Sequence, residues 1–271
     1  MIKFYYNLAP NPMKVALCLE EMGLKYELAP VDTRKGEQHS PDYLAINPNA
    51  KVPAIVDEGT PIFDSNAILL YLAEKTGKFL GPKAGPKRGE LLSWMMFVAS
   101  GIGPYSGQAV HFRNFAPEPK EYAVNRYSFE AERHWGLLEA RLAKQRYMVG
   151  DSYSVVDMAV WGWSRLIPFV LGAEAPARFP PVQRHLAEIN ARPAAVRALA
   201  ALGSVRGERI AADVDTGSSA AACPGRTSAS RPSPSPIRAT PSGARSRSSG
   251  ASRWRRSRSR AGRESSSPIS A

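Results

Sequence analysis

Residues 51–77 read KVPAIVDEGTPIFDSNAILLYLAEKTG. Two short apolar runs, 52–57 and 61–64, flank the turn-forming sequence EGT, a pattern typical of two strands joined by a tight turn. From Ser65 onward the apolar residues follow helical spacing, and Gly77 is a typical helix stop. This segment therefore predicts a strand–turn–strand–helix unit.

The preceding 50 residues extend this unit. Residues 2–6 (IKFYY) alternate and are rich in aromatics, which predicts a strand, and residues 12–23 (PMKVALCLEEMG) show helical spacing before a glycine. Residues 25–32 predict a second strand and residues 39–48 a short helix. The order β-α-β-α-β-β-α within 80 residues favours a small α/β domain with a mixed sheet.

Strand patterns stop after the Pro/Gly/Lys-rich segment 81–89 (GPKAGPKRG), which we interpret as a linker. Residues 90–202 carry long helical patterns and predict an all-α second domain. In 121–144, six residues are expected along one stripe: Tyr122, Asn125, Phe129, Trp135, Leu138 and Leu142. A further helix is predicted to begin at Ser154, with Asp157 completing a capping box.

The net charge of +12 belongs mostly to the end of the chain. Of the 36 basic and 24 acidic residues, 13 and 4 lie in residues 203–271, which leaves a net charge of +3 for residues 1–202. This Arg/Ser/Pro-rich segment predicts a disordered tail, because it has too little apolar surface to bury. Two other interpretations stay open: nucleic-acid binding through phosphates, and translation of a frame-shifted stretch of GC-rich DNA.

Composition excludes several classes of function. Two cysteines and four histidines show neither a disulfide framework nor metal-ligand spacing, so no metal is expected. The sequence starts without an apolar signal core, and its longest apolar-rich run is well short of a membrane span. We therefore expect a cytoplasmic protein with no membrane partner, and nucleic acid as a partner only through the tail.

Several linked motifs in residues 1–202 resemble the cytosolic glutathione transferase family: NPNAKVPAIVD (47–57), DSNAILLYLAEKTG (64–77) and YSVVDMAVWGW (153–163). The stretches YYNLAPNPMKVAL (5–17), GIGPYSGQAVHF (101–112) and YAVNRY (122–127) are most similar to the bacterial nu class, whose members include disulfide-bond reductases. The resemblance implies a thioredoxin-like domain followed by a helical domain, usually in a homodimer. It also implies glutathione as co-substrate, with conjugation to electrophiles, reduction of small disulfides, or both.

Asn11, in LAPNPMK (8–14), is the candidate catalytic residue. A free thiol with a pKa near 8.5 is only about 3% thiolate at pH 7, and lowering that pKa by roughly two units is worth about 2.7 kcal/mol. The residues alone predict that Asn11 is the N-cap of a helix with proline following. Its amide oxygen could cap while its NH2 donates to a sulfur. By resemblance the matching Asn lies at the glutathione sulfur, with a Thr where this chain has Ala9.

Tyr5 and Cys18 are the other candidates for this role. Tyr5 is a weaker alternative, because other classes of the family use a tyrosine at the end of the first strand. Cys18 lies in an apolar helical pattern, and we interpret it as a buried, inert thiol.

The resemblance also implies a set of glutathione-binding residues. Pro53 is expected to be cis, so that the backbone of Val52 pairs with the tripeptide, although the residues alone only mark an edge strand. Asp64 and Ser65 at a helix N-terminus would hold the γ-glutamyl group, or act only as caps. The glycyl carboxylate is expected near Gln38, His39 and Lys51.

The helical domain is expected to supply the rest of the site. Arg126 would reach glutathione from the partner subunit, and the electrophile is expected near Tyr105, Gln108, His111 and Phe112. Because Ala9 removes one hydroxyl, a non-catalytic glutathione-binding or regulatory protein of the same fold is the alternative function.

Overall fold

The computed structural model describes residues 1–201. Its α/β part follows the predicted order: β1 (Ile2–Tyr6), α1 (Pro10–Met22), β2 (Tyr26–Pro30), η1 (Glu37–His39), α2 (Pro41–Leu44), β3 (Ala54–Asp57), β4 (Thr60–Phe63) and α3 (Ser65–Thr76). The predicted strand–turn–strand–helix unit is confirmed as β3, β4 and α3. The predictions for residues 203–271 lie outside the described residues.

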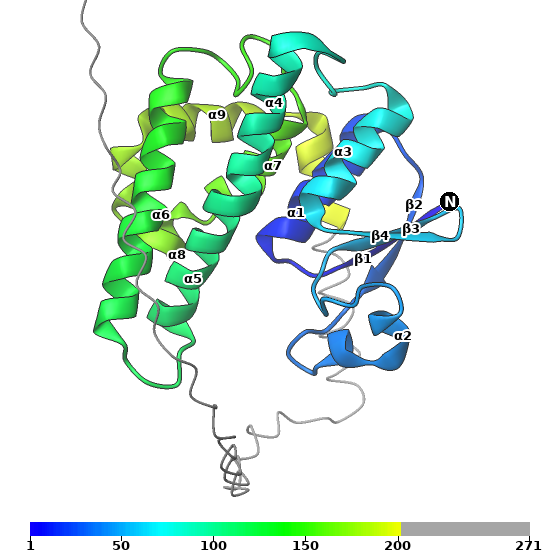
Figure 1. The fold of residues 1–271 in the computed structure, drawn as a ribbon, viewed down its shortest axis with the longest axis horizontal. Coiled ribbons are helices and arrows are strands. Elements are labelled where there is room, and N and C mark those ends of the chain that lie inside the picture. Colours follow the sequence, from blue (N-terminus) through cyan, green and yellow to red (C-terminus); the bar gives the residue numbers. More distant parts are fainter. Residues whose placement is uncertain (202–271) are drawn as a thin grey trace, which may run out of the picture. The chain divides into compact units, whose positions relative to one another are not determined.

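The four strands form one mixed sheet in the order β2-β1-β3-β4. β1 pairs in parallel with β2, whereas β3 pairs antiparallel with both β1 and β4. α1 and α3 cover one face of the sheet, and the short α2 lies on the other side (Figure 1). Alternation along β1 explains this arrangement, because Ile2, Phe4 and Tyr6 are buried while Lys3 and Tyr5 point to the opposite face.

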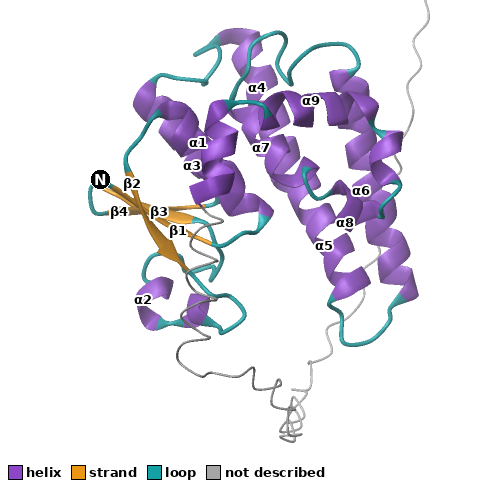
Figure 2. Ribbon diagram, turned by 180° about the vertical axis from the view of Figure 1, so that it is seen from behind, coloured by secondary structure: helices purple, strands orange, loops and turns teal. Residues whose placement is uncertain are grey.

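The second part of the described chain is helical (Figure 2). Its elements are α4 (Gly85–Phe97), the π-helical turn η2 (Val98–Ile102), α5 (Gly103–Asn114), α6 (Glu121–Leu142), α7 (Val155–Ser164), α8 (Ile167–Leu171), η3 (Ala175–Arg178) and α9 (Pro180–Asn190). Residues 193–201 are also helical. α4 begins at Gly85, within the predicted linker segment 81–89, and Pro86 lies in its first turn, where a missing N–H costs no helical hydrogen bond.

The predicted stripe on α6 is wrong in its first half. Trp135, Leu138 and Leu142 are buried as expected, but Tyr122 and Phe129 are 82% and 62% exposed. The buried face continues through Ala131, which is two residues from Phe129 and therefore about 200° around the helix. The predicted stripe combined residues from two faces.

The capping box at the start of α7 is confirmed. The buried carboxylate of Asp157 accepts hydrogen bonds from the amide and hydroxyl of Ser154, at 2.9 and 3.0 Å, and from the amide of Met148 at 2.8 Å. It also bonds Nε2 of His185 on α9 at 2.9 Å, which makes that nitrogen a donor. Asp157 thus links α7 to the segment before it at Met148 and to α9 at His185.

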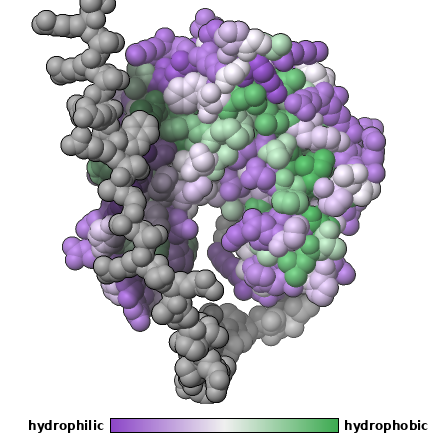
Figure 3. All heavy atoms as spheres, viewed as in Figure 1, coloured by the Kyte–Doolittle hydropathy of each residue, from purple (hydrophilic) through white to green (hydrophobic). Residues whose placement is uncertain are grey.

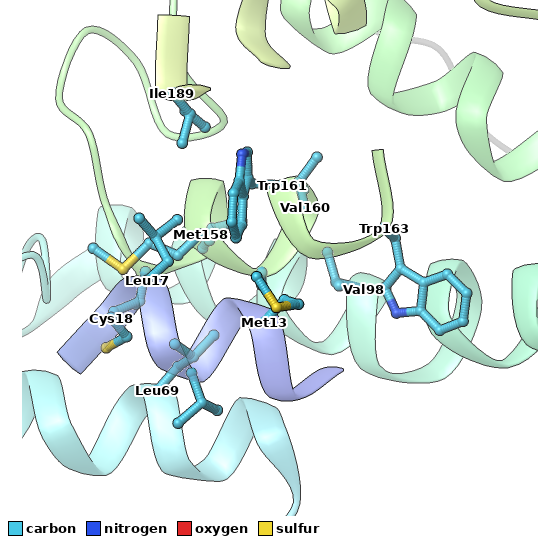
Figure 4. Close-up of a cluster of buried hydrophobic side chains, with 14 of the residues drawn as sticks. Met13, Leu17, Cys18, Leu69, Val98, Met158, Val160, Trp161, Trp163 and Ile189 are labelled. Carbon is cyan, nitrogen blue, oxygen red and sulfur yellow. The ribbon is translucent and has the colours of Figure 1, made fainter. Parts of the chain in front are cut away.

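α7 also joins the two parts of the fold. It packs against α1, and one hydrophobic core includes Leu17 and Cys18 of α1 together with Met158 and Trp161 of α7 (Figure 4). The contact is close at Gly162, because a Cβ there would lie 2.6 Å from the carbonyl oxygen of Pro10. A glycine is needed where this helix crosses the start of α1.

Candidate functional site

A pocket of about 560 Å³ lies between the α/β and helical parts of the described chain. This volume is within the usual range for small-molecule sites. Figure 3 shows the hollow between the two parts. Of the site residues predicted from sequence, six line the pocket: Asn11, Lys51, Val52, Pro53, Asp64 and Ser65. They come from the start of α1, the turn before β3 and the junction of β4 with α3.

The start of α1 differs from the prediction. The helix begins at Pro10, and Ala9 occupies the N-cap position without a side-chain cap. The predicted N-cap role of Asn11 is therefore wrong, because Asn11 already lies in the first turn. The cap was misplaced because Pro10, rather than Pro12, takes the first helical position, where its fixed φ is favourable.

The first turn of α1 has one backbone N–H without an acceptor in the described part of the chain. Pro10 and Pro12 have no N–H, and the amide of Ala9 donates to Oδ1 of Asn7 at 2.9 Å. The amide of Met13 donates to the carbonyl of Ala9 at 3.2 Å. Among the described residues, the backbone N–H of Asn11 has no acceptor. The positive partial charge at the start of this helix is therefore carried by an N–H group of a residue that lines the pocket.

The side chain of Asn11 is bonded across the domain boundary. Its Oδ1 accepts a hydrogen bond of 3.0 Å from Nε1 of Trp163 on α7. Sequence reasoning missed Trp163, which also lines the pocket. The pattern WGW contained a signal for it. Trp161 and Trp163 are two residues apart on a helix and cannot share a face, so only one of them can point into the same part of the core. Figure 4 shows Trp161 near Met158, and Trp163 further along the helix beside Val98.

The turn before β3 is built around the carbonyl of Lys51. This oxygen accepts from the hydroxyl of Tyr43 at 2.7 Å and from Nδ2 of Asn47 at 2.6 Å. The Val52–Pro53 bond is cis, as predicted. The backbone of Val52 has no hydrogen-bond partner among the described residues, although it lies at the pocket. A peptide-like ligand could pair with it.

Asp64 and Ser65 lie where α3 begins. Oδ1 of Asp64 caps the helix by accepting from the amides of Asn66 and Ala67, at 2.9 and 3.1 Å. Asp64 has a φ of 65°, a conformation that is strained for a residue with a side chain. Ser65 is 5% exposed and begins the helix. The capping role is thus present, and the helix N-terminus also faces the pocket with groups suited to an anion.

Lys14 is the second residue that sequence reasoning missed. Its side chain is 1% exposed, lines the pocket floor and donates from Nζ to Oδ1 of Asn66 at 2.8 Å. Burial lowers the Lys14 pKa to about 7, and the nearby charge of Asp64 opposes this shift. In the sequence, Lys14 gave no signal beyond its place in a helix.

Four predicted residues do not line the pocket. Tyr5 packs against Tyr43 on the far face of the sheet, with ring centroids 5.7 Å apart. Gln38 donates to the carbonyl of Thr33, and His39 is exposed on η1. The guanidinium of Arg126 pairs with Glu130 at 2.6 Å. Their proposed roles stay predictions.

The residues expected around the electrophile divide in the same way. Gln108 lines the pocket, together with Gly103, Pro104 and Gly107 of α5. Tyr105, in contrast, packs on His134, with ring centroids 4.7 Å apart. His111 and Phe112 pack edge to face with each other and do not line the pocket.

Other chemistries find no support in residues 1–201. Cys18 is fully buried, and burial raises its thiol pKa, so it is a structural residue as predicted. No group of three or more His, Cys, Asp or Glu residues in this range could hold a metal ion. None of the helices described is long and apolar enough to cross a membrane.

Comparisons with known proteins agree with this architecture. The family model "Glutathione S-transferase, N-terminal domain" matches residues 2–74, and "Glutathione S-transferase, C-terminal domain" matches residues 93–193. The disulfide-bond oxidoreductase YfcG of Escherichia coli K12 is 40% identical over 217 residues, covering 77% of this chain and 100% of that protein.

Solved structures are also similar. A glutathione transferase from Burkholderia graminis, with two glutathione molecules bound per subunit, is 41% identical with a TM-score of 0.68, and the match covers 73% of this chain and 87% of that one. A glutathione transferase from Pseudomonas putida, with one glutathione disulfide bound per subunit, is 36% identical with a TM-score of 0.68, covering 73% and 90% of the two chains. The chain belongs to the glutathione S-transferase family.

Proposed function

We propose that this protein binds glutathione in the pocket and uses Asn11 to stabilise its thiolate, which attacks an electrophile or a small disulfide. One observation carries the proposal. Three separate segments bring to the same pocket hydrogen-bonding groups that have no partner within residues 1–201: the first turn of α1, the backbone of Val52 and the start of α3. Glutathione is a peptide-like anion with a thiol, and it needs a group of each kind.

Each part of glutathione has a partner in this arrangement. The backbone of Val52 pairs with the cysteinyl backbone, and the N-terminus of α3 at Ser65 binds the γ-glutamyl carboxylate. Asp64 binds the α-ammonium, and Lys51 provides positive charge for the glycyl carboxylate. With the tripeptide so placed, its sulfur lies toward Asn11.

Asn11 offers two donors to the sulfur. Its side-chain NH2 and its backbone N–H are both unused among the described residues, and the dipole of α1 adds positive potential. Donors at a helix N-terminus stabilise a thiolate and lower its pKa. No protein cysteine is required for this step.

Disulfide reduction would then use two glutathione molecules. The bound thiolate attacks one sulfur of the disulfide, forms a mixed disulfide with it and releases the other sulfur as a thiolate. A second glutathione thiolate attacks the glutathione sulfur of the mixed disulfide, which yields glutathione disulfide and the second substrate thiol. The two glutathiones supply both electrons. The ligands in the Burkholderia and Pseudomonas structures fit such a sequence.

The test is a paired assay of the wild type and Asn11→Ala. We would measure glutathione binding by calorimetry, conjugation to an aryl halide, and glutathione-driven reduction of a small disulfide. The variant should bind glutathione and lose about 10- to 100-fold in turnover, the effect of one charge-assisted hydrogen bond, because the backbone N–H of residue 11 is kept. Asn114→Ala, at an exposed amide on α5, serves as the matched control. Equal turnover of Asn11→Ala and the wild type would refute the role of Asn11.

A glutathione-binding protein without turnover is the second candidate. The observation that favours it is Ala9, which provides neither a cap nor a hydroxyl at the start of α1. This function predicts normal glutathione binding in the same assays, with no turnover by the wild type.

A further inference from the structure

The amide of Asn11 has two possible orientations. Its oxygen and nitrogen are nearly equal in size, so the group could present either an acceptor or a donor to the pocket. Only the NH2 can donate to a thiolate. A residue that fixes the orientation of this amide therefore controls whether the proposed reaction is helped or opposed.

Trp163 is such a residue. An indole N–H is a donor only, so it can pair with the Asn11 amide only through the oxygen. The distance of 3.0 Å is that of a normal hydrogen bond. The flipped amide would place two donors face to face and lose this bond. With the oxygen held by Trp163, the NH2 is left for a ligand.

The indole is itself held in place. Trp163 is 7% exposed, and two glycines of α5 lie against its ring. A Cβ on Gly103 would lie 3.4 Å from Nε1, and a Cβ on Gly107 would lie 3.5 Å from Cη2. Gly162, the residue before Trp163 on α7, lets this helix approach the start of α1. Because Gly103 and Gly107 have no side chains, the indole has room to lie against α5 and to bond Asn11.

We propose that Trp163 is a positioning residue, which orients the Asn11 amide so that its NH2 faces the glutathione sulfur. This inference rests on the proposed function of Asn11. A residue of the helical domain, 152 positions after Asn11 in the chain, would then set which atom of the Asn11 amide faces the ligand.

Trp163→Phe tests the proposal, because it removes the N–H and keeps an aromatic ring. The amide of Asn11 is then free to flip, and the thiolate loses part of its donor. We expect the pKa of bound glutathione to rise and turnover at pH 6.5 to fall about tenfold, with glutathione affinity little changed. At a pH above the thiol pKa the two proteins should converge, which a misfolded variant would not do.

Trp161→Phe is a matched control. It lies on the same helix and also loses an indole hydrogen bond, which Trp161 makes to Oδ1 of Asn190 at 2.8 Å. Within residues 1–201, the other ionisable groups that line the pocket are Lys14, Lys51 and Asp64, and they are the same in all these variants. Because these groups are the same in every variant, we attribute a difference between the pH profiles to the substitution itself.

A double-mutant cycle gives the decisive readout, with the thiolate followed by its ultraviolet absorbance. In the Asn11→Ala background, Trp163→Phe should raise the pKa of bound glutathione no further. If Asn11→Ala raises the pKa and Trp163→Phe does not, the positioning role is overturned and the proposed function stands. If neither variant changes the pKa, both proposals are overturned. A change with Trp161→Phe equal to that with Trp163→Phe would also overturn the positioning role.

Discussion

Nζ of Lys14 donates to Oδ1 of Asn66 across 2.8 Å, which joins α1 to α3 under the pocket. The pair is almost fully enclosed, since the two residues are 1% and 5% exposed. A lysine in such a place resists protonation, because its charge would lose hydration without a paired carboxylate. This contact has a consequence for stability that can be measured.

Protein stability should depend on pH through Lys14. Its pKa is about 7 in the folded protein and 10.5 as the ordinary value, so between these values the unfolded chain binds a proton that the folded chain lacks. The free energy of unfolding should therefore rise with pH across this window. Compared with Lys14→Met, the wild type should gain about 2 kcal/mol from pH 7.5 to pH 9, at about 1.4 kcal/mol per unit.

Urea denaturation of both proteins at several pH values would measure this difference. Lys144→Met, at an exposed position, is the control and should show no such trend. If the difference between the wild type and Lys14→Met is flat across the window, Lys14 is protonated in the folded protein.

Ala9→Thr should stabilise α1. Ala9 already has the extended conformation of an N-cap, with φ −69° and ψ 161°. Because Pro10 and Pro12 lack an N–H, the new hydroxyl can accept only from the amide of Asn11. We expect the free energy of unfolding to rise by about 1 kcal/mol. Ala9→Val, which has the same shape without the hydroxyl, is the comparison, and equal stability of the two variants would contradict the prediction.

Gly162→Ala should separate the two helices that meet at the pocket. The added Cβ would lie 2.6 Å from the carbonyl oxygen of Pro10, and backbone atoms cannot yield without a shift of α1 or α7. We expect a loss of about 1–3 kcal/mol in thermal or urea unfolding. Gly136→Ala, in α6, meets nothing within 4 Å and should instead stabilise by up to about 1 kcal/mol. The prediction fails if both variants change stability in the same direction.

Asp157→Ala should be the most destabilising of these changes. The buried carboxylate accepts from Met148, Ser154 and His185, and its loss leaves several buried donors without acceptors. We expect a loss of at least about 3 kcal/mol, since each unsatisfied group costs about 1–3 kcal/mol. Asp151→Ala, at an exposed position, should change the unfolding midpoint little. A small effect of Asp157→Ala would mean that water replaces the carboxylate.

The elements with strong local signals were predictable from sequence. The turn at Gly59 and the stop at Gly77 identified β3, β4 and α3, and the Ser154 capping box identified the start of α7. The start of α1 was misplaced because the sequence PNP offers two prolines, and local pattern alone does not say which one takes the first helical position.

The sequence could identify a pocket-lining residue only where that residue lies within a recognisable local motif. Val52, Asp64 and Ser65 line the pocket as the resemblance implied, and each lies within one of the motifs that carry the resemblance. Trp163 and Lys14 could not be identified in this way, because their hydrogen-bond partners lie 152 and 52 residues away in the chain. Such contacts depend on how α7 and α3 pack on α1, and no spacing within either segment encodes them.

The two prolines that flank Asn11 separate folding from chemistry at this position. The ring of Pro10 fixes a φ that suits the first helical residue, and Pro12 has no N–H that would need an acceptor. The helix therefore begins without a cap from the side chain of residue 11. We expect a replacement of Asn11 to remove its hydrogen bond with Trp163 and to leave the start of the helix unchanged. We therefore expect that residue 11 can carry a hydroxyl, a thiol or an amide without a change in where α1 begins.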